Sequence, residues 1–346
     1  MSRLRLKWKL LVPLALVAVA YLLAPQLAWA AGPEAAGGHG LPLYITVIER
    51  FFLALTAGGL AFGILHVEIE LLHWGWAWLR GRRPGAAQPA KERNQAAIAL
   101  VPRFDVHQRI QHFVLMGSFI VLAVTGIPQK FYRYDPFDGF IALMGGMEVV
   151  RIIHRVAAGV MIVDGIYHML YLAPGLLTFR GGLPLMSLTS ALEMIPNRKD
   201  FTDFFHMMSY FLGAKAEPPR FGRYSYLQKF DYWAVGWGLV IMTASGLILM
   251  LPALGFEITG TAAIAAALIS HSDEAILATG WILVVHLYHA HLAPRVFPFN
   301  TTIFTGYISE RQFKEEHSLE YEKWTRRFEA MPKIAVGGRA TTTRHR

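Results

Sequence analysis

The chain has 346 residues, of which 54% are hydrophobic and 16% charged, with a formal net charge of +9 and no cysteine. So apolar a composition excludes an ordinary soluble protein and indicates a polytopic membrane protein. Without cysteine the chain itself cannot hold an iron–sulfur cluster, a covalently attached c-type haem or a disulfide. The basic residues fall between apolar stretches, where they set orientation in a lipid bilayer, so nucleic acid is not an expected partner.

Residues 1–30 have the pattern of a secretory signal peptide. Four basic residues precede an apolar core at 10–23, and Ala28-Trp29-Ala30 matches an A-x-A cleavage site. Cleavage would leave the mature N-terminus outside the cytoplasm. The alternative is an uncleaved N-terminal anchor.

Five further apolar stretches are long enough to cross a bilayer. We expect an extra transmembrane helix and a basic cytoplasmic linker within 31–100, a four-helix haem-binding bundle within 101–294, and a cytoplasmic tail at 295–346. The stretches lie at about 44–65, 110–131, 149–172, 233–254 and 274–292.

Lysine and arginine mark the cytoplasmic side. They are concentrated after the first, third and fifth stretches, and none occurs within 230–294. The positive-inside rule then places these segments and the C-terminus in the cytoplasm. Residues 200–212 mix aromatic and polar side chains, as an interfacial helix would. His317, in the charged tail, is expected at the surface.

An internal repeat relates the second and third stretches to the fourth and fifth. It predicts two similar helical hairpins, which together form an all-α bundle able to hold cofactors between facing helices. The matched positions, 117 to 120 residues apart, are Arg103 and Arg223, Gln108 and Gln228, Arg109 and Lys229, His112 and Tyr232, Thr125-Gly126 and Ser245-Gly246, His154 and His271, and His168 and His286.

Histidines fall at two heights in this topology. His154 and His168 are 14 residues apart, which is about 21 Å along a helix and nearly on one face. That spacing is too long for one metal ion, but it suits two flat cofactors stacked across a hydrocarbon core of about 30 Å. Histidine is a common axial ligand of haem iron. The pattern therefore predicts two b-type haems.

The outer haem has one candidate pair of ligands, His154 and His271, whereas the inner level has His112, His168 and His286. Bundle symmetry favours His168 with His286. His66, near the inner end of the first stretch, leaves a third haem open, although we interpret it and His73 as lining the inner interface. Glycines that would let a porphyrin or a neighbouring helix approach are Gly117, Gly126, Gly159, Gly236, Gly238 and Gly246.

Three other polar residues are candidates for a proton or quinone site. Asp164 is a carboxylate in mid-membrane, one helical turn before His168, and could orient an imidazole or pass protons. His289 and His291 are expected at the water boundary, where they could meet a haem propionate or a quinone headgroup.

Four motifs resemble the formate dehydrogenase gamma-subunit family, the b561-like di-haem cytochrome b anchors also found beside thiosulfate reductases and multihaem cytochromes. They are R-F-D-V-H-Q-R-I-Q-H (103–112), V-R-I-I-H-R-V-A-A-G (150–159), R-Y-S-Y-L-Q-K-F-D-Y-W (223–233) and T-G-Y-I-S-E-R (305–311).

The resemblance implies an outer haem on His154 and His271, an inner haem on His112 and His286, and a quinone site beside the inner haem. Short members of the family need no haem ligand at the position of His168. They also lack the signal peptide and the first apolar stretch of this chain. The inner pairing therefore remains open between His112 and His168.

These features predict an electron-transfer subunit that connects the quinone pool with a partner redox subunit through two b haems. The partner, a multihaem cytochrome c or an iron–sulfur/molybdenum subunit, would perform the substrate chemistry, because this chain has no motif for it. One alternative is a self-standing cytochrome b561-like transmembrane reductase. Another is a histidine-rich metal-ion transporter, which would need ligands in one coordination sphere rather than about four helical turns apart.

Overall fold

The computed structural model describes residues 43–81, 100–177, 192–297 and 299–329. The predicted signal or anchor, most of the basic linker and the end of the tail lie outside these residues. Within them, five helices are long and apolar enough to cross a membrane, as expected for an all-α polytopic membrane protein. These candidate spans are Leu43–Leu79, Val106–Lys130, Met147–Ala173, Tyr226–Met250 and Ala262–Leu292.

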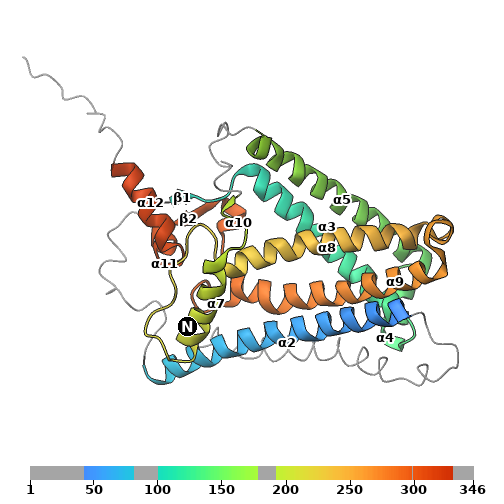
Figure 1. Ribbon diagram of the computed structural model, residues 1–346, viewed down its shortest axis with the longest axis horizontal. Coiled ribbons are helices and arrows are strands. Elements are labelled where there is room, and N and C mark those ends of the chain that lie inside the picture. The colour runs from blue at the N-terminus through green and yellow to red at the C-terminus, as the bar shows by residue number, and fades with distance from the viewer. Residues whose placement is uncertain (1–42, 82–99, 178–191, 298, 330–346) are drawn as a thin grey trace, which may run out of the picture.

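The long helices run side by side along the molecule (Figure 1). α3 packs along α5, to which the short helix α4 connects it, and α8 packs along α9. α2 packs on the outside of α9. The α3–α5 pair and the α8–α9 pair make few contacts with each other. The repeat thus appears as two tight hairpins with looser contact between them. The bounds are α2 Leu43–Leu79, α3 Val106–Lys130, α4 Asp135–Leu143, α5 Met147–Leu177, α8 Tyr226–Met250 and α9 Pro252–Trp281.

The two hairpins begin with the same capping chemistry. Asp105 caps α3 in a reciprocal capping box with Gln108, and Ser225 caps α8 in the same way with Gln228. Each box satisfies two backbone N–H groups that the first helical turn leaves unpaired. The repeat therefore extends to the residues that start each hairpin.

The predicted boundaries of two spans were wrong. α9 begins directly after α8, with Leu251 capping both helices, and the fifth span starts at residue 262 instead of 274. The alanine-rich run 262–267 favours helix, because alanine has the highest helix propensity. His271 consequently lies inside a helix. α2 likewise continues to Leu79, well beyond the expected end at 65.

Beyond Trp281 the helix continues as two π-helical turns, η3 (Ile282–His286) and η4 (Tyr288–Leu292). Such wide turns are rare and occur frequently at functional sites. Here they carry three histidines, His286, His289 and His291.

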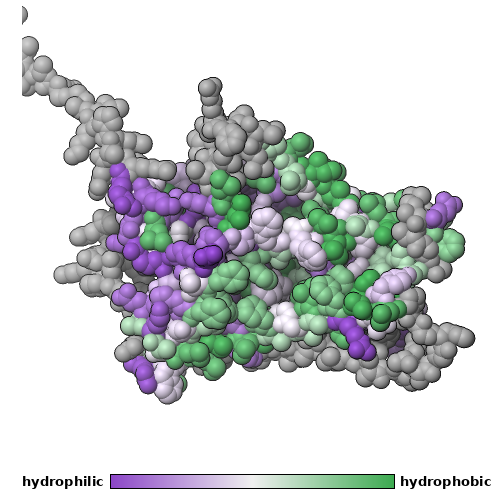
Figure 2. All heavy atoms as spheres, viewed as in Figure 1, coloured by the Kyte–Doolittle hydropathy of each residue, from purple (hydrophilic) through white to green (hydrophobic). Residues whose placement is uncertain are grey.

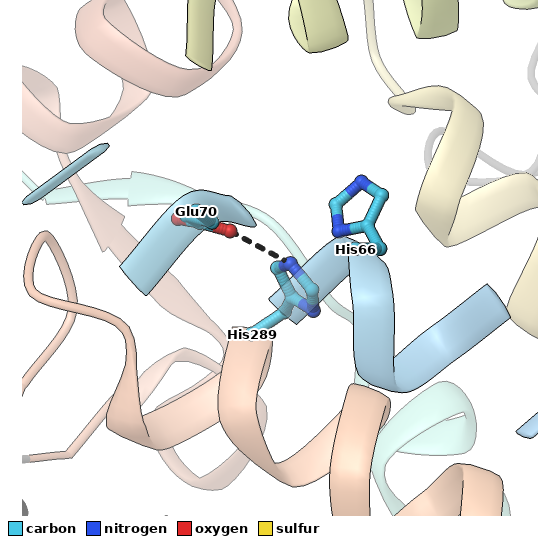
Figure 3. A group of neighbouring side chains, drawn as sticks. All are labelled: His66, Glu70 and His289. Atoms are coloured by element: carbon cyan, nitrogen blue, oxygen red, sulfur yellow. Dashed lines mark hydrogen bonds and ion pairs between the residues drawn. The ribbon is translucent and has the colours of Figure 1, made fainter. Parts of the chain in front are cut away.

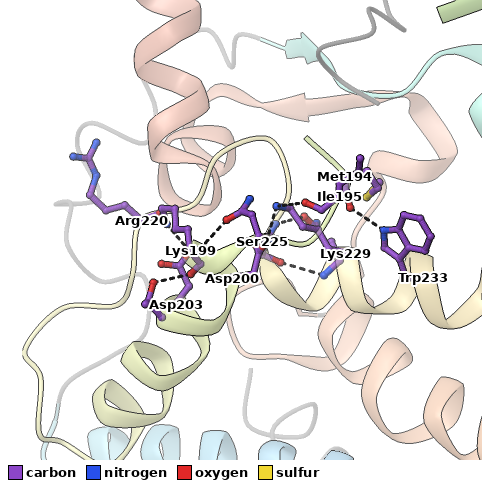
Figure 4. Close-up of polar contacts among 12 residues, drawn as sticks. Met194, Ile195, Lys199, Asp200, Asp203, Arg220, Ser225, Lys229 and Trp233 are labelled. Carbon is purple, nitrogen blue, oxygen red and sulfur yellow. Dashed lines mark hydrogen bonds and ion pairs between the residues drawn. The ribbon is translucent and has the colours of Figure 1, made fainter. Parts of the chain in front are cut away.

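A separate helix, α7 (Arg198–Phe211), covers the segment for which an interfacial helix was predicted. α7 and the residues just before it are tied to the start of α8, as Figure 4 shows: Lys229 Nζ lies 2.9 Å from Asp200 Oδ2 on α7, and the indole of Trp233 donates to the carbonyl of Met194 at 3.0 Å. Lys229 is buried, so this ion pair is largely shielded from water.

The tail folds back onto the residues that precede α3. Strand β2 (Tyr307–Ser309) pairs antiparallel with β1 (Leu100–Pro102), a contact that sequence analysis missed because each strand has only three residues. Val101 on β1 and Ile308 on β2 form a small core with Phe313. The tail helices are α10 (Thr302–Thr305), α11 (Glu310–Glu316) and α12 (Ser318–Glu329).

His317 joins this tail to the bundle and is not the surface residue that was predicted. Its side chain is buried, Nδ1 donates to the carbonyl of Gly222 at 2.9 Å, and Nε2 accepts from Arg103 at 3.4 Å. Figure 2 shows hydrophilic residues gathered over this end and hydrophobic residues along the long helices. That distribution fits a body surrounded by lipid with one polar end.

Candidate haem sites

The outer candidate site pairs one histidine from each hairpin. His154 on α5 and His271 on α9 have ring centroids 6.2 Å apart. Two imidazole nitrogens that bind one metal ion from opposite sides are about 4 Å apart, at about 2 Å per bond, and each centroid lies a ring radius farther back. The observed separation therefore fits an iron atom between the two rings.

A hydroxyl group holds each of these rings. Thr125 Oγ1 lies 2.8 Å from His154 Nδ1 and donates its own proton to the carbonyl of Val121 at 2.7 Å, so it accepts from Nδ1–H. Ser245 Oγ stands in the same relation to His271 Nδ1, at 3.0 Å. Both imidazoles are thus fixed in the tautomer that leaves Nε2 free to bind a metal.

The glycine that follows each hydroxyl residue makes room for the ring. A Cβ atom on Gly126 would lie 3.0 Å from His154 Cε1, and one on Gly246 would lie 3.2 Å from His271 Cε1. Both distances are too short for an ordinary contact. The Thr-Gly and Ser-Gly pairs of the repeat therefore form one ring-holding motif in each hairpin.

The inner candidate site pairs His112 on α3 with His286 on η3, whose ring centroids are 6.5 Å apart. His286 Nδ1 lies 3.0 Å from Asp231 Oδ2, and the other oxygen of Asp231 accepts from Trp281 at 2.8 Å. A carboxylate partner orients a histidine ligand and increases its basicity. The spacing of this pair matches the spacing of the outer pair.

His168, the competing inner candidate, has both ring nitrogens engaged. Nδ1 lies 2.9 Å from Gln111 Oε1, and Nε2 lies 2.9 Å from the hydroxyl of Tyr232. Close by, a Cβ atom on Gly165 would lie only 2.5 Å from the side chain of Leu239, so α5 and α8 are packed tightly here. His168 is thus held by protein groups rather than facing a second imidazole.

One continuous cavity of about 4040 Å³ reaches both candidate sites. Asp164, which is 6% exposed, lines it, and a Cβ atom on Gly159 or Gly236 would meet no described atom within 4 Å. The residues present therefore fit two haems. Other predicted residues that line the cavity are His112, His154, His168, His271, His286, His289, His291, Gly126, Gly238 and Gly246; Gly117 is outside this lining.

The expected water-boundary histidines are partly packed inside the protein. His289 Nε2 lies 3.0 Å from Glu70 Oε2, and His291 stacks on Phe299 with ring centroids 4.3 Å apart. His73 Nδ1 lies 3.0 Å from the carbonyl oxygen of Phe211 on α7.

Two acidic residues of the cavity were not predicted from the sequence. Asp231 occupies the repeat position of Gln111, so the repeat itself could have pointed to a partner for His286. Glu274 follows His271 by about one turn, is 4% exposed, and its Oε2 has no hydrogen-bond partner among the described residues. The sequence marked Glu274 only as the start of a span.

The chain is similar to known proteins over much of its length, although no protein-family model matches it. It is 25% identical over 225 residues to proteins named "Formate dehydrogenase, cytochrome b556(fdo) subunit" from three Escherichia coli strains. The match covers 64% of this chain and 92% of each relative. These relatives confirm the resemblance to the formate dehydrogenase gamma-subunit family that the four motifs indicated.

Proposed function

We propose that this chain is the membrane cytochrome b subunit of a respiratory oxidoreductase in a bacterial inner membrane. It transfers electrons between the quinone pool and a partner redox subunit. The observation that carries the proposal is the matched pair of imidazole contacts, 6.2 Å and 6.5 Å between centroids, each joining the two hairpins. The names of the relatives, cytochrome b subunits of formate dehydrogenase, support the same role.

In this proposal His154 and His271 hold the outer haem, and His112 and His286 hold the inner one. When bound, haem b supplies one-electron redox chemistry. The protein fixes the distance between the two sites: His271 and His286 are 15 residues apart, which is about 22 Å along a helix. Electrons can then cross without any moving part of the protein.

Quinone chemistry belongs at the inner end of the cavity in this proposal. His291 lines that end, and Asp164 lies on α5 between His154 and His168. A buried carboxylate in a membrane interior can hold or pass a proton. We propose Asp164 for that role, with His289 and His291 near the quinone headgroup. A partner on the outer face, a multihaem cytochrome c or an iron–sulfur/molybdenum subunit, would exchange electrons with the outer haem.

Haem counting on the purified protein tests the proposal. We expect a b-type spectrum after dithionite reduction and about two haems per chain, which is the number of bis-histidine sites. His112→Ala or His286→Ala should leave only the outer haem, whereas His168→Ala should leave both. The absence of a b-type spectrum would contradict the proposal. Loss of the inner haem in His168→Ala alone would assign that haem to His168, and a third haem would point to His66.

A quinol analogue tests the electron-transfer role itself. Added to the oxidised protein in membrane vesicles, it should reduce the inner haem first, because that haem is nearest the proposed quinone end. His271→Ala should leave this first reduction intact but prevent electrons from reaching an external acceptor. Reduction of both haems at unchanged rates in His286→Ala would contradict the proposed route.

A further inference from the structure

We propose that His66, Glu70 and His289 form a zinc site that joins α2 to the end of the fifth span. Figure 3 shows the three side chains converging, with the first two on α2 and the third on η4. One ligand atom from each residue lies within 4.8 Å of the others, and Glu70 Oε2 is 3.0 Å from His289 Nε2. The site uses none of the proposed haem ligands and shares only His289 with the proposed quinone end of the cavity, so zinc binding can be tested separately from haem binding.

Each of the three side chains is held through its other polar atom. His66 Nε2 lies 2.9 Å from the hydroxyl of Tyr226, and Glu70 Oε1 accepts from the indole of Trp74 at 3.1 Å. His289 Nδ1 donates to the carbonyl of Val285 at 2.8 Å. Protein metal sites commonly hold their ligands by this kind of outer hydrogen bond. The remaining atoms, His66 Nδ1, Glu70 Oε2 and His289 Nε2, are the ones available for an ion.

Burial gives an independent reason to expect an ion. His66 is 3% exposed and Glu70 is 1% exposed. His66 Nδ1 has no hydrogen-bond partner among the described residues, although it is buried. Buried polar atoms are nearly always paired, and those that are not often indicate a missing ion or water. A cation here would pair this nitrogen and also the buried carboxylate.

The donor set points to zinc. Two imidazoles and one carboxylate, with a water molecule in the fourth position, form a recurrent zinc environment, whereas magnesium and calcium favour oxygen ligands alone. Donor atoms that share a zinc ion at about 2.1 Å lie about 3.4 Å from one another. The separations here, 3.0 Å for one pair and up to 4.8 Å for the set, need only small side-chain rotations.

Arg295 is the cationic residue near the proposed zinc site, and it interacts with Glu316 as well as with Glu70. Arg295 is exposed, and the carboxylates of Glu70 and Glu316 raise its pKa. Because Glu316 also offsets the charge of Arg295, Glu70 can serve the ion. Zinc at this position would fix His289 on η4, three residues beyond His286, against α2, which among the described helices lies outside the two hairpins.

Metal analysis tests the site directly. The full-length protein, purified with a tag that contains no histidine and supplied with zinc, should hold about one zinc ion per chain, and zinc-edge absorption spectra should show two imidazole ligands. His66→Asn or Glu70→Gln should reduce zinc at least about tenfold with haem content unchanged. His73→Asn, on the same helix but bonded to the carbonyl of Phe211, is the matched control and should keep the zinc.

Wild-type protein without bound zinc after this treatment would overturn the proposal. So would equal zinc content in His66→Asn, Glu70→Gln and His73→Asn, or a zinc spectrum without imidazole ligands. The wild-type measurement needs no substitution, so misfolding of a variant cannot hide the answer. Haem content is measured on the same samples, and its absence from wild type would count against the proposed function but not against the zinc site.

Discussion

The hydroxyl oxygen of Thr125 lies 2.8 Å from Nδ1 of His154 and holds the ring of a proposed haem ligand. Ser245 and His271 repeat this contact at 3.0 Å in the second hairpin. In both cases the hydroxyl donates to a carbonyl of its own helix, so its oxygen can only accept from the imidazole. The repeat therefore carries the chemistry that orients each ring as well as the position of each histidine.

Thr125→Val, which keeps the shape of the side chain and removes the hydroxyl, should weaken the outer haem selectively. We expect the affinity for that haem to fall by about 10–100-fold, as for other lost partners of histidine ligands. Haem retention during dilution in detergent measures the effect. Ser118→Ala is the matched control, because Ser118 makes the same bond to its own helix, at 2.7 Å to Val114, with no histidine attached. Equal haem loss in both variants would contradict the assigned role.

Asp231→Asn should raise the midpoint potential of the inner haem. The carboxylate accepts from His286 Nδ1 at 3.0 Å, and its negative charge favours the oxidised iron. Asparagine keeps the size of the side chain but not the charge. Redox titration followed in the visible spectrum measures both haems.

Gln111→Leu is the control for this substitution, since Gln111 occupies the same repeat position but holds His168. It should leave both potentials unchanged. A shift of the inner potential in Gln111→Leu and none in Asp231→Asn would show that His168, rather than His286, is the inner ligand.

The sequence predicted the five long apolar helices well, although not all of their ends, because apolar length is a local pattern. It could not decide between His112 and His168. That choice depends on which ring faces another ring across the hairpins and which is held by Gln111 and Tyr232. These are contacts between helices that no spacing within one helix can specify.

Three other features escaped prediction for similar reasons. The His66, Glu70 and His289 cluster needs α2 to lie against the fifth span, residues more than 200 positions apart. The strands around Val101 and Ile308 are too short to leave a periodic pattern. His317 lies in a charged segment, and only its contacts with Gly222 and Arg103 make it a buried residue.

Tyr232→Phe should lower the stability of the folded protein but leave its haem content unchanged. It removes the hydroxyl that lies 2.9 Å from His168 Nε2 in a part-buried position, and a lost hydrogen bond of this kind is worth about 0.5–1.5 kcal/mol. Thermal unfolding in detergent gives the stability, and the haem content is measured alongside. Tyr167→Phe, which removes an exposed bond to His107, should change the stability less because water can replace it. Loss of a haem in Tyr232→Phe would place His168 within a haem site.

The docking of the tail should weaken as the pH falls. Burial, with Arg103 as the next cause, lowers the pKa of His317 from 6.5 to about 3. The undocked histidine therefore binds a proton below pH 6.5 while the docked one stays neutral, and stability is lost as the pH falls from about 6.5 towards about 3. The loss is at most about 1.4 kcal/mol for each pH unit.

Hydrogen exchange of the β1–β2 amides at pH 7.5 and pH 5, corrected for the intrinsic rate, measures this effect. His317→Gln can still donate to Gly222 and accept from Arg103 but cannot gain a proton, so its tail should show less pH dependence than wild type. His206→Gln, on α7 and bonded to the carbonyl of Glu217, is the control and should behave as wild type. If His317→Gln keeps the full pH dependence, another group controls the docking of the tail.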